Sequence, residues 1–249
     1  MSLVVTRLDQ VSVIQIDRPP VNAMDLPLLC ALAQTVEAES KVAGALVIAG
    51  RPGAFSAGVD LKAILAYTPE QHRAMLQGVN RVCWAVAAAP IPTVAAVTGH
   101  AIGGGFLVMA GCDLRIGAAG VGVYALPEVR AGIPFPAGAM VLLQTMVPRV
   151  AARRLALADQ RIGPEEALAL GVLDRVLPAD EVVPAAIAEA TRLAALPRRV
   201  YQRTKAALYG EALHDLRSYA GEDNDPNVER WLSDDTTAAS QAVLKARKA

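Results

Sequence analysis

The first half of the chain alternates between short apolar runs and longer amphipathic stretches. Five apolar runs are typical of strands: residues 3–8, 11–17, 45–49, 93–97 and 112–116. Two stretches between them have helical periodicity and begin with capping signals, namely Asp25 and the capping box Thr68-Pro69-Glu70-Gln71. Strands that alternate with helices predict an α/β fold with a largely parallel sheet.

The second half of the chain has a mostly helical pattern. After about Val141, apolar residues recur at helical spacing over five segments: residues 149–158, 164–170, 180–196, 199–209 and 236–248. Only residues 173–177 have an extended pattern, and no internal repeat is visible. We therefore expect a core over residues 1–195 and a helical C-terminal region over residues 196–249.

The composition narrows the class of protein. Hydrophobic residues make up 53% of the 249 residues, and the formal net charge is zero, which argues against a nucleic-acid-binding protein. No apolar run approaches about 18 uncharged residues, so we expect no membrane span. Cys30, Cys83 and Cys112 are widely spaced in apolar surroundings, which is typical of reduced cysteines and predicts a cytoplasmic protein.

Residues 99–107 form the most informative segment. Gly103, Gly104 and Gly105 lie between a strand-like run and a helix-like run, where the absence of Cβ atoms allows another molecule to approach the backbone. Amide groups at the start of a helix attract negative charge, so this segment is a candidate site for an oxyanion. The alternative is a tight turn between two closely packed elements.

Residues 55–62 form a second candidate segment. Gly58 permits an unusual backbone conformation and Asp60 is a candidate helix cap, which leaves the amide groups near Val59 pointing outward. An ordinary glycine turn explains the same residues. Ser56 does not fit a nucleophile elbow, because Ala54 stands where that motif requires glycine.

Glu128 is the candidate carboxylate. It lies in a mostly apolar stretch, and burial there raises the pKa of a carboxyl group and suits it to proton transfer. The alternative is a solvated glutamate that is paired with Arg130.

Two other patterns carry little weight. Residues 120–125 match the Gly-x-Gly-x-x-Ala form of a dinucleotide fingerprint, but Pro127 falls where the following helix belongs. His72, His100 and His214 are isolated, so no metal site is predicted, and the role of His100 stays open.

Taken together, several motifs resemble the crotonase superfamily, also called the enoyl-CoA hydratase/isomerase family. The resemblance covers nearly the whole chain and rests on six segments: residues 18–24, 55–62, 99–105, 112–115, 127–132 and 167–174. It implies a spiral of ββα turns followed by a helical trimerisation region. It also implies an acyl-CoA thioester ligand and a homotrimer or a hexamer built from two trimers.

The resemblance also assigns residues by motif position. The oxyanion hole falls on the backbone N–H groups of Val59 and Gly104, and Glu128 is the acid/base. Lys205 falls where a C-terminal helix brings charge to coenzyme A. The remaining substrate-binding positions lie along the coenzyme A path and the acyl pocket: Ala57, Asp60, Leu61, Lys62, Gly103, Phe106, Leu107 and Phe135.

One departure from the family pattern bears on the chemistry. Family hydratases carry two glutamates, and Leu107 occupies the position of the first one. A single carboxylate in a dry site suits proton movement better than water addition. Pro136 stands where dienoyl-CoA isomerases carry an acidic residue, which argues against that activity.

We therefore expect a Δ3,Δ2-enoyl-CoA isomerase of fatty acid β-oxidation, with no metal or redox cofactor. The alternatives are an enoyl-CoA hydratase, another crotonase-type lyase or hydrolase, and a catalytically silent acyl-CoA-binding protein. The sequence does not give the acyl chain length.

Overall fold

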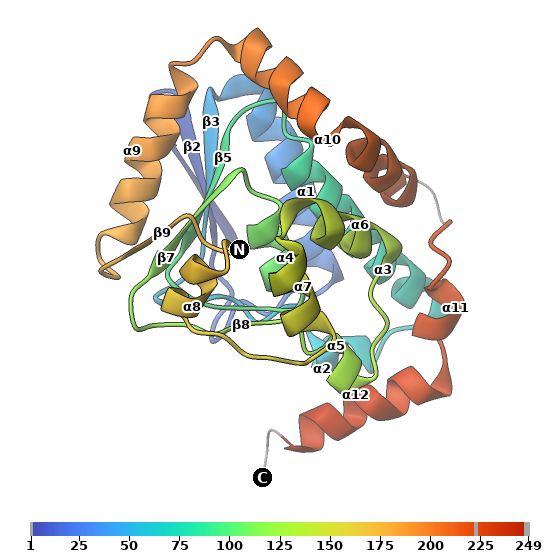
Figure 1. The fold of residues 1–249 in the computed structure, drawn as a ribbon. Helices are drawn as coiled ribbons and strands as arrows, with labels where there is room; N and C mark the ends of the chain where they lie inside the picture. Colours follow the sequence, from blue (N-terminus) through green and yellow to red (C-terminus); the bar gives the residue numbers. More distant parts are fainter. Residues whose placement is uncertain (1, 222–223, 247–249) are drawn as a thin grey trace.

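A six-stranded sheet forms the centre of the protein (Figure 1). The computed structural model describes residues 2–221 and 224–246. The strand order is β1-β2-β3-β5-β7-β9, and only the β1–β2 hairpin is antiparallel. The strands are β1 (Leu3–Leu8), β2 (Val11–Ile16), β3 (Ala45–Ala49), β5 (Thr93–Val97), β7 (Leu114–Ala118) and β9 (Arg175–Leu177).

Three short strands form a second, parallel sheet in the order β4-β6-β8. They are β4 (Gly53–Ser56), β6 (Gly99–Ile102) and β8 (Tyr124–Ala125). Each one follows a strand of the large sheet along the chain, so the chain passes three times from the large sheet to the small one. This repeated passage is the spiral of the crotonase fold that the resemblance implied.

Helices cover both faces of the large sheet. In Figure 1, α9 (Val182–Ala194) lies on one side, and the other side is covered by α1 (Leu26–Val42), α3 (Pro69–Ala87), α4 (Gly104–Ala110) and α6 (Ala137–Met146). Along β3, Leu46 and Ile48 belong to the core on the α1–α3 side, whereas Val47 packs with the residues of α9. A strand that is apolar on both faces is typical of a parallel sheet buried on both sides.

The C-terminal helices return to the core. The long helix α10 (Arg198–Gly221) packs along α3 and α6, and α12 (Asp234–Ala246) contacts α2 (Leu61–Ile64) and α5 (Glu128–Ala131). The remaining helices are α7 (Arg149–Ala156), α8 (Pro164–Ala169) and α11 (Val228–Trp231). Among the residues described, no helix has both the length and the apolar composition that a membrane crossing needs.

The capping signals are confirmed. Asp25 accepts a hydrogen bond from the Leu28 amide at the start of α1, and Thr68 and Gln71 form the reciprocal bonds of a capping box at the start of α3. The prediction for α10 was too short, because the helix continues beyond Tyr209 through Gly210 to Gly221. A glycine in a helix interior lowers helix stability by about 1 kcal/mol relative to alanine. The burial of Leu216 and Ala220 in the second half of α10 offsets this loss.

Candidate active site

The small sheet brings the three candidate segments together. Residues 57–60 follow β4, residues 103–105 follow β6, and residues 126–128 follow β8. The carboxyl ends of parallel strands share one edge of a sheet, so these segments meet there. A Cβ atom built on Gly58 would lie 2.6 Å from the carbonyl oxygen of Ile102 and 3.0 Å from the amide nitrogen of Gly104. Only glycine allows this approach, and its φ of +81° also requires it.

Buried polar side chains hold the segment after β4. Asn22 donates hydrogen bonds to the carbonyl oxygens of Ala54 and Phe55, at 3.2 and 3.0 Å. The Ser56 hydroxyl donates to the carbonyl oxygen of Asn22 and accepts from the amide of Gly58. Ser56 therefore has a structural partner on each side, which explains a serine that lacks the context of a nucleophile.

The amides of Val59 and Gly104 are both available to a ligand. Met24 donates to the carbonyl oxygen of Gly58 and accepts from the amide of Asp60, so the intervening N–H of Val59 points away from Met24. Gly104 is the first residue of α4, where an N–H group has no acceptor within the helix. Both residues line one cavity. Two such donors at a common site are the arrangement that stabilises an oxyanion.

Glu128 lies directly beside these amides. It is the first residue of α5, and its Oε1 is 2.9 Å from the position that a Cβ on Gly103 would occupy. Its Oε2 is buried and has no hydrogen-bond partner among the residues that the structure describes. Burial raises the pKa of Glu128 to about 7, a backbone hydrogen bond opposes this increase, and the negative charge of Asp159 adds to it.

The alternative pairing of Glu128 with Arg130 is not formed. Arg130 instead makes a 3.0 Å ion pair with Asp159. Arg130 is thus not paired with the ionised form of Glu128, which agrees with the direction of its pKa shift.

The cavity that contains these groups has a volume of about 580 Å³. Glu128 is the only carboxylate among the described residues that line it, and Arg130 and Arg161 are its cations. Its apolar wall includes side chains from five helices and one loop: Leu61, Val79, Leu107, Ile133, Trp231, Ala242 and Val243. The cavity can therefore take a ligand with an apolar tail and hold a carbonyl oxygen near a proton-accepting carboxylate.

The other sequence-predicted positions divide into two groups. Ala57, Leu61, Gly103 and Leu107 line the cavity. Asp60 caps α2 by accepting from the amides of Lys62 and Ala63 and pairs with Arg18 at 2.9 Å, and Lys62 is exposed on α2. Neither residue lines the cavity.

Two aromatic residues expected in the acyl pocket lie elsewhere. Phe106 is fully buried in the core, because it is one position along α4 from Leu107 and thus faces about 100° away from it. Phe135 packs against the same core, and its carbonyl oxygen accepts a hydrogen bond from Asn227. Neither side chain lines the cavity, which corrects the expectation that they form its wall.

Lys205 and His100 are also outside the cavity. The ammonium group of Lys205 is buried and makes a 2.9 Å ion pair with Asp113, which corrects the expectation that it reaches coenzyme A. His100 is exposed on β6 and does not line the cavity. Within the described ranges, no group of three His, Cys, Asp or Glu side chains is arranged to hold a metal ion.

Sequence reasoning missed the contributions of the C-terminal helices. Trp231 in α11 and Ala242 and Val243 in α12 reach the cavity across more than 100 residues of chain from Glu128. Their apolar spacing indicates only that one helix face is buried. It does not indicate which part of the core that face meets.

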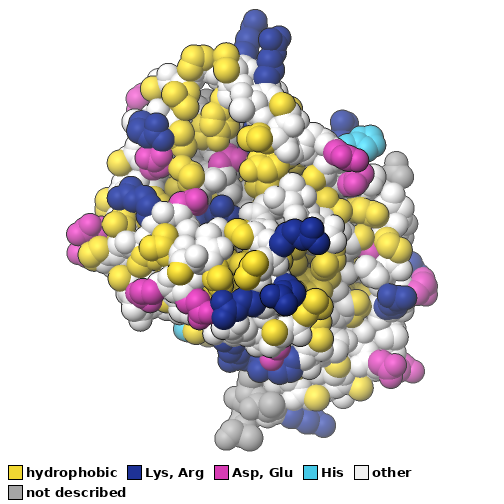
Figure 2. Space-filling view, in the orientation of Figure 1, with side chains coloured by type: hydrophobic (Ala, Val, Ile, Leu, Met, Phe, Trp, Pro, Cys, Tyr) yellow, Lys and Arg dark blue, Asp and Glu magenta, His cyan; other side chains and the backbone are white. Residues whose placement is uncertain are grey.

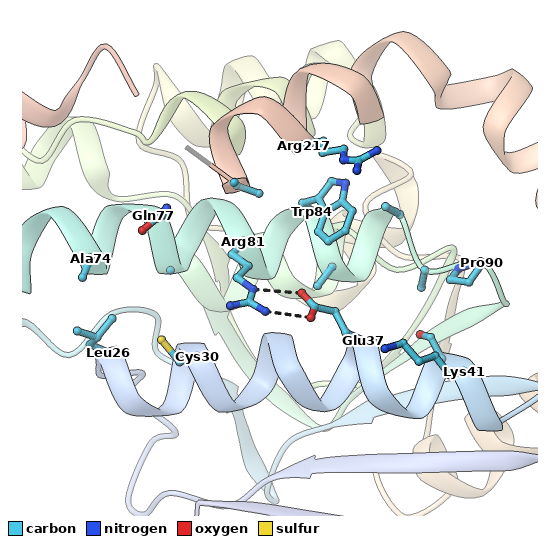
Figure 3. A pocket seen from close by; sticks show the side chains of 17 residues that line it. Leu26, Cys30, Glu37, Lys41, Ala74, Gln77, Arg81, Trp84, Pro90 and Arg217 are labelled. Carbon is cyan, nitrogen blue, oxygen red and sulfur yellow. Dashed lines mark hydrogen bonds and ion pairs between the residues drawn. The ribbon is translucent and has the colours of Figure 1, made fainter. Parts of the chain in front are cut away.

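A second large cavity lies between α1, α3 and the end of α10, with a volume of about 780 Å³ (Figure 3). Arg81 and Glu37 form two parallel hydrogen bonds across it, and Trp84 stands at its edge beside Arg217 (Figure 3). None of the sequence-predicted site residues lines this cavity. It is therefore separate from the candidate active site.

Comparisons with known proteins agree with the geometry. The sequence profile of the enoyl-CoA hydratase/isomerase family matches residues 6–240. The chain is 29% identical to human mitochondrial enoyl-CoA delta isomerase 1 over 202 residues, which are 80% of this chain and 67% of that protein. It is 31% identical to rat mitochondrial enoyl-CoA hydratase domain-containing protein 3 over 198 residues, which are 78% of this chain and 65% of that protein. The matches thus span about two thirds of these relatives' lengths.

Solved structures show the same fold. The crystal structure of human mitochondrial delta3-delta2-enoyl-CoA isomerase superposes with a TM-score of 0.92 at 26% identity, over 100% of this chain and 98% of that one. An enoyl-CoA hydratase from Mycobacterium marinum superposes with a TM-score of 0.83 at 29% identity, over 94% of this chain and 100% of that one. On its sequence and its fold, the chain belongs to the enoyl-CoA hydratase/isomerase family.

Proposed function

We propose that the protein is a Δ3,Δ2-enoyl-CoA isomerase, which converts a 3-enoyl-CoA into the trans-2-enoyl-CoA for fatty acid β-oxidation. One observation carries the proposal. Among the described residues that line the active-site cavity, Glu128 is the only carboxylate, and it lies beside the segment that presents the amide of Gly104. Moving a proton between two carbons of one substrate needs a single acid/base, whereas the hydratases of the family carry two glutamates.

The mechanism follows from the positions of these groups. Glu128 removes a proton from C2, and the negative charge moves to the thioester oxygen. The amides of Val59 and Gly104 donate hydrogen bonds to that oxygen, and the loss of one such donor typically costs about 3–4 kcal/mol of barrier. Protonated Glu128 then returns the proton at C4, and the double bond is formed between C2 and C3.

The pKa of Glu128 suits both halves of this reaction. A carboxyl group with a pKa of about 7 is ionised often enough near neutral pH to accept a proton. It is also a stronger base than an ordinary glutamate, which helps it to remove a weakly acidic C2 proton. Burial by the apolar wall is the main cause of that pKa, so the cavity and the base act together.

Leu107 favours isomerisation over hydration. It is 2% exposed, lines the cavity, and occupies the position of the first glutamate of the family hydratases. An apolar side chain there neither binds nor activates a water molecule. Exclusion of water also protects a dienolate until its proton is returned.

The surface is consistent with assembly of several copies. Apolar side chains lie among lysine and arginine side chains on the face that Figure 2 shows. Val150 and Leu157 at α7, and Val200 and Leu208 in α10, are each more than half exposed. We propose a cytoplasmic homotrimer or a hexamer of two trimers that uses no metal or redox cofactor. These exposed apolar side chains support an interface between copies.

The test is incubation with trans-3-hexenoyl-CoA in D₂O, with the native protein and Glu128→Gln compared. We expect conversion to the 2-enoyl thioester with little deuterium at C4, because the shielded Glu128 returns the proton that it removed from C2, and no conversion by the variant. Hydration of trans-2-hexenoyl-CoA in place of isomerisation would replace the proposal with a hydratase. Release of free coenzyme A would indicate a hydrolase, and binding without any turnover would indicate a silent acyl-CoA-binding protein.

A further inference from the structure

A smaller chamber adjoins the active-site cavity. Its volume is about 160 Å³, close to that of an engineered cavity of about 150 Å³ that accommodates benzene. It is lined by side chains of α2, α3, α11, α12 and nearby loops: Leu61, Ile64, Leu65, Tyr67, His72, Ile133, Trp231, Thr236, Thr237 and Ser240. Leu61, Ile133 and Trp231 line both the chamber and the active-site cavity. These three side chains are therefore the wall between the two spaces.

Trp231 is the largest part of this wall, and its backbone is firmly placed. The Trp231 amide donates to the carbonyl oxygen of Asn227 at 2.8 Å, and the side chain of Asn227 donates to the carbonyl oxygen of Phe135. Just before this turn, Asp225 accepts hydrogen bonds from Asn80 and from the amide of Ala137. The loop that leads into α11 is thus tied to α3 and to the start of α6.

The indole ring itself is held by packing alone. Trp231 is 4% exposed and belongs to the main core, and its Nε1 has no hydrogen-bond partner within the described part of the chain. No polar contact would therefore have to be broken to replace the ring with a smaller apolar side chain.

The two sides of the wall differ in polarity. On the cavity side, Val79, Leu107 and Val243 continue the apolar surface. On the chamber side, His72 and the hydroxyl-bearing residues Thr237 and Ser240 contribute to the lining. Burial lowers the pKa of His72, so its imidazole is neutral near pH 7 and offers no charge to a ligand. A hydrocarbon tail therefore contacts apolar side chains up to the wall, and it would meet more polar side chains beyond the wall.

We propose that Trp231, with Leu61 and Ile133, ends the acyl cavity and sets the longest acyl chain that the enzyme accepts. This inference rests on the proposed function, because it takes the cavity as the acyl site. Each methylene group that enters an apolar cavity raises the affinity about fourfold. The gain should stop where the tail meets the indole ring.

The test compares the native protein with Trp231→Ala across hexenoyl-, decenoyl- and tetradecenoyl-CoA with the double bond at C3. The readout is the ratio of kcat/KM for the long substrate to that for the short one. We expect Trp231→Ala to raise this ratio by about fifteenfold, which corresponds to two additional methylene groups buried in the space that the indole ring vacates. Trp231→Phe, which keeps an aromatic wall, should stay near the native ratio.

Two further variants complete the design. Trp84→Ala removes the same side chain from the separate cavity between α1, α3 and α10, so its ratio should equal the native one (Figure 3). Leu61→Ala opens the wall from α2, and it tests the inference if Trp231→Ala does not fold. The affinity of saturated acyl-CoAs of the same lengths is measured in parallel, because binding does not depend on the reaction.

The outcomes separate the inference from the proposed function. If the chain-length limit shifts in the binding assay but neither the native protein nor any variant turns over the substrates, the wall is supported and the isomerase proposal is overturned. Normal isomerisation with the same limit in the native protein, Trp231→Ala and Leu61→Ala would overturn the wall and keep the isomerase. Equal shifts in Trp231→Ala and Trp84→Ala would also overturn the inference, because they would report general loosening of the fold.

Discussion

Burial of Glu128 makes the stability of the fold depend on pH in a way that one substitution can isolate. The pKa of this group rises from 4.5 to about 7 on folding, and a tenfold change in an acid constant corresponds to about 1.4 kcal/mol. Ionising Glu128 in the folded chain therefore costs about 3 kcal/mol more than in the unfolded chain. Glu128→Gln keeps the shape of the side chain and removes the titration.

The sign follows from proton binding. The folded chain binds this proton more tightly than the unfolded chain, so the contribution to stability is complete below about pH 4.5. It is lost as the pH rises through about 7. The native protein should thus lose stability between these values, relative to a variant that has no proton to lose.

The assay is urea unfolding of the native protein and Glu128→Gln near pH 5 and near pH 8. We expect the unfolding free energy of the variant, relative to that of the native protein, to be about 2 kcal/mol higher near pH 8 than near pH 5. The contributions of all other titrating groups cancel in this comparison, because both proteins share those groups. Glu211→Gln, on the exposed surface of α10, is the matched control and should keep a constant difference from the native protein.

If the difference in unfolding free energy between the native protein and Glu128→Gln is the same at both pH values, the reasoning is refuted. This result would mean that water reaches Glu128 in the folded chain and that burial does not raise its pKa. The proposed base would then be an ordinary carboxylate, and the apolar wall would have no part in its chemistry.

Three further predictions concern other parts of the structure. Gly103→Ala should lower kcat/KM for a 3-enoyl-CoA by at least about a hundredfold, because a Cβ would lie 2.9 Å from Oε1 of Glu128 at a residue with a φ of +54°. A loss of less than about threefold would show that Glu128 moves aside freely. Leu107→Glu should weaken isomerisation and introduce hydration of trans-2-enoyl-CoA, measured as loss of the enoyl thioester absorbance. Unchanged isomerisation without hydration would show that this position does not select the reaction. Lys205→Met should cost about 3 kcal/mol in urea unfolding, because it leaves the carboxylate of Asp113 without its buried cation. Its kcat/KM should be unchanged at a temperature where it is folded, and a selective loss of activity would place Lys205 in substrate binding.

Local features of the fold were readable from the sequence because their causes are local. The capping residues Asp25 and Thr68 act within one helical turn, and the uninterrupted apolar run of β3 reflects a strand buried on both faces. The end of α10 was missed because glycine is a poor helix former in isolation. The burial of Leu216 against the rest of the protein outweighs that local preference.

The residues of the site also divide into those that the sequence identifies and those that only the tertiary structure places. Glu128 and Leu107 were identified from their types and their positions in motifs, and the structure places both at one cavity. Phe106 was misplaced because position in a motif does not give the face of a helix. The sequence offers Arg130 as an alternative partner of Glu128, and only the fold shows that Arg130 pairs with Asp159 instead.

The sequence by itself predicted the strands of the large sheet, the helix starts at Asp25 and Thr68, the glycine segments, and Glu128 as the candidate carboxylate. These depend on periodicity and on the conformational freedom of individual residues, which act over a few positions. Tertiary structure alone decided that β4, β6 and β8 align as one small sheet and bring the amides of Val59 and Gly104 to Glu128. It also decided that Trp231, more than 100 residues from Glu128 in the chain, lines the same cavity. Both results depend on packing between segments far apart in the chain, where the burial of many side chains outweighs any local preference.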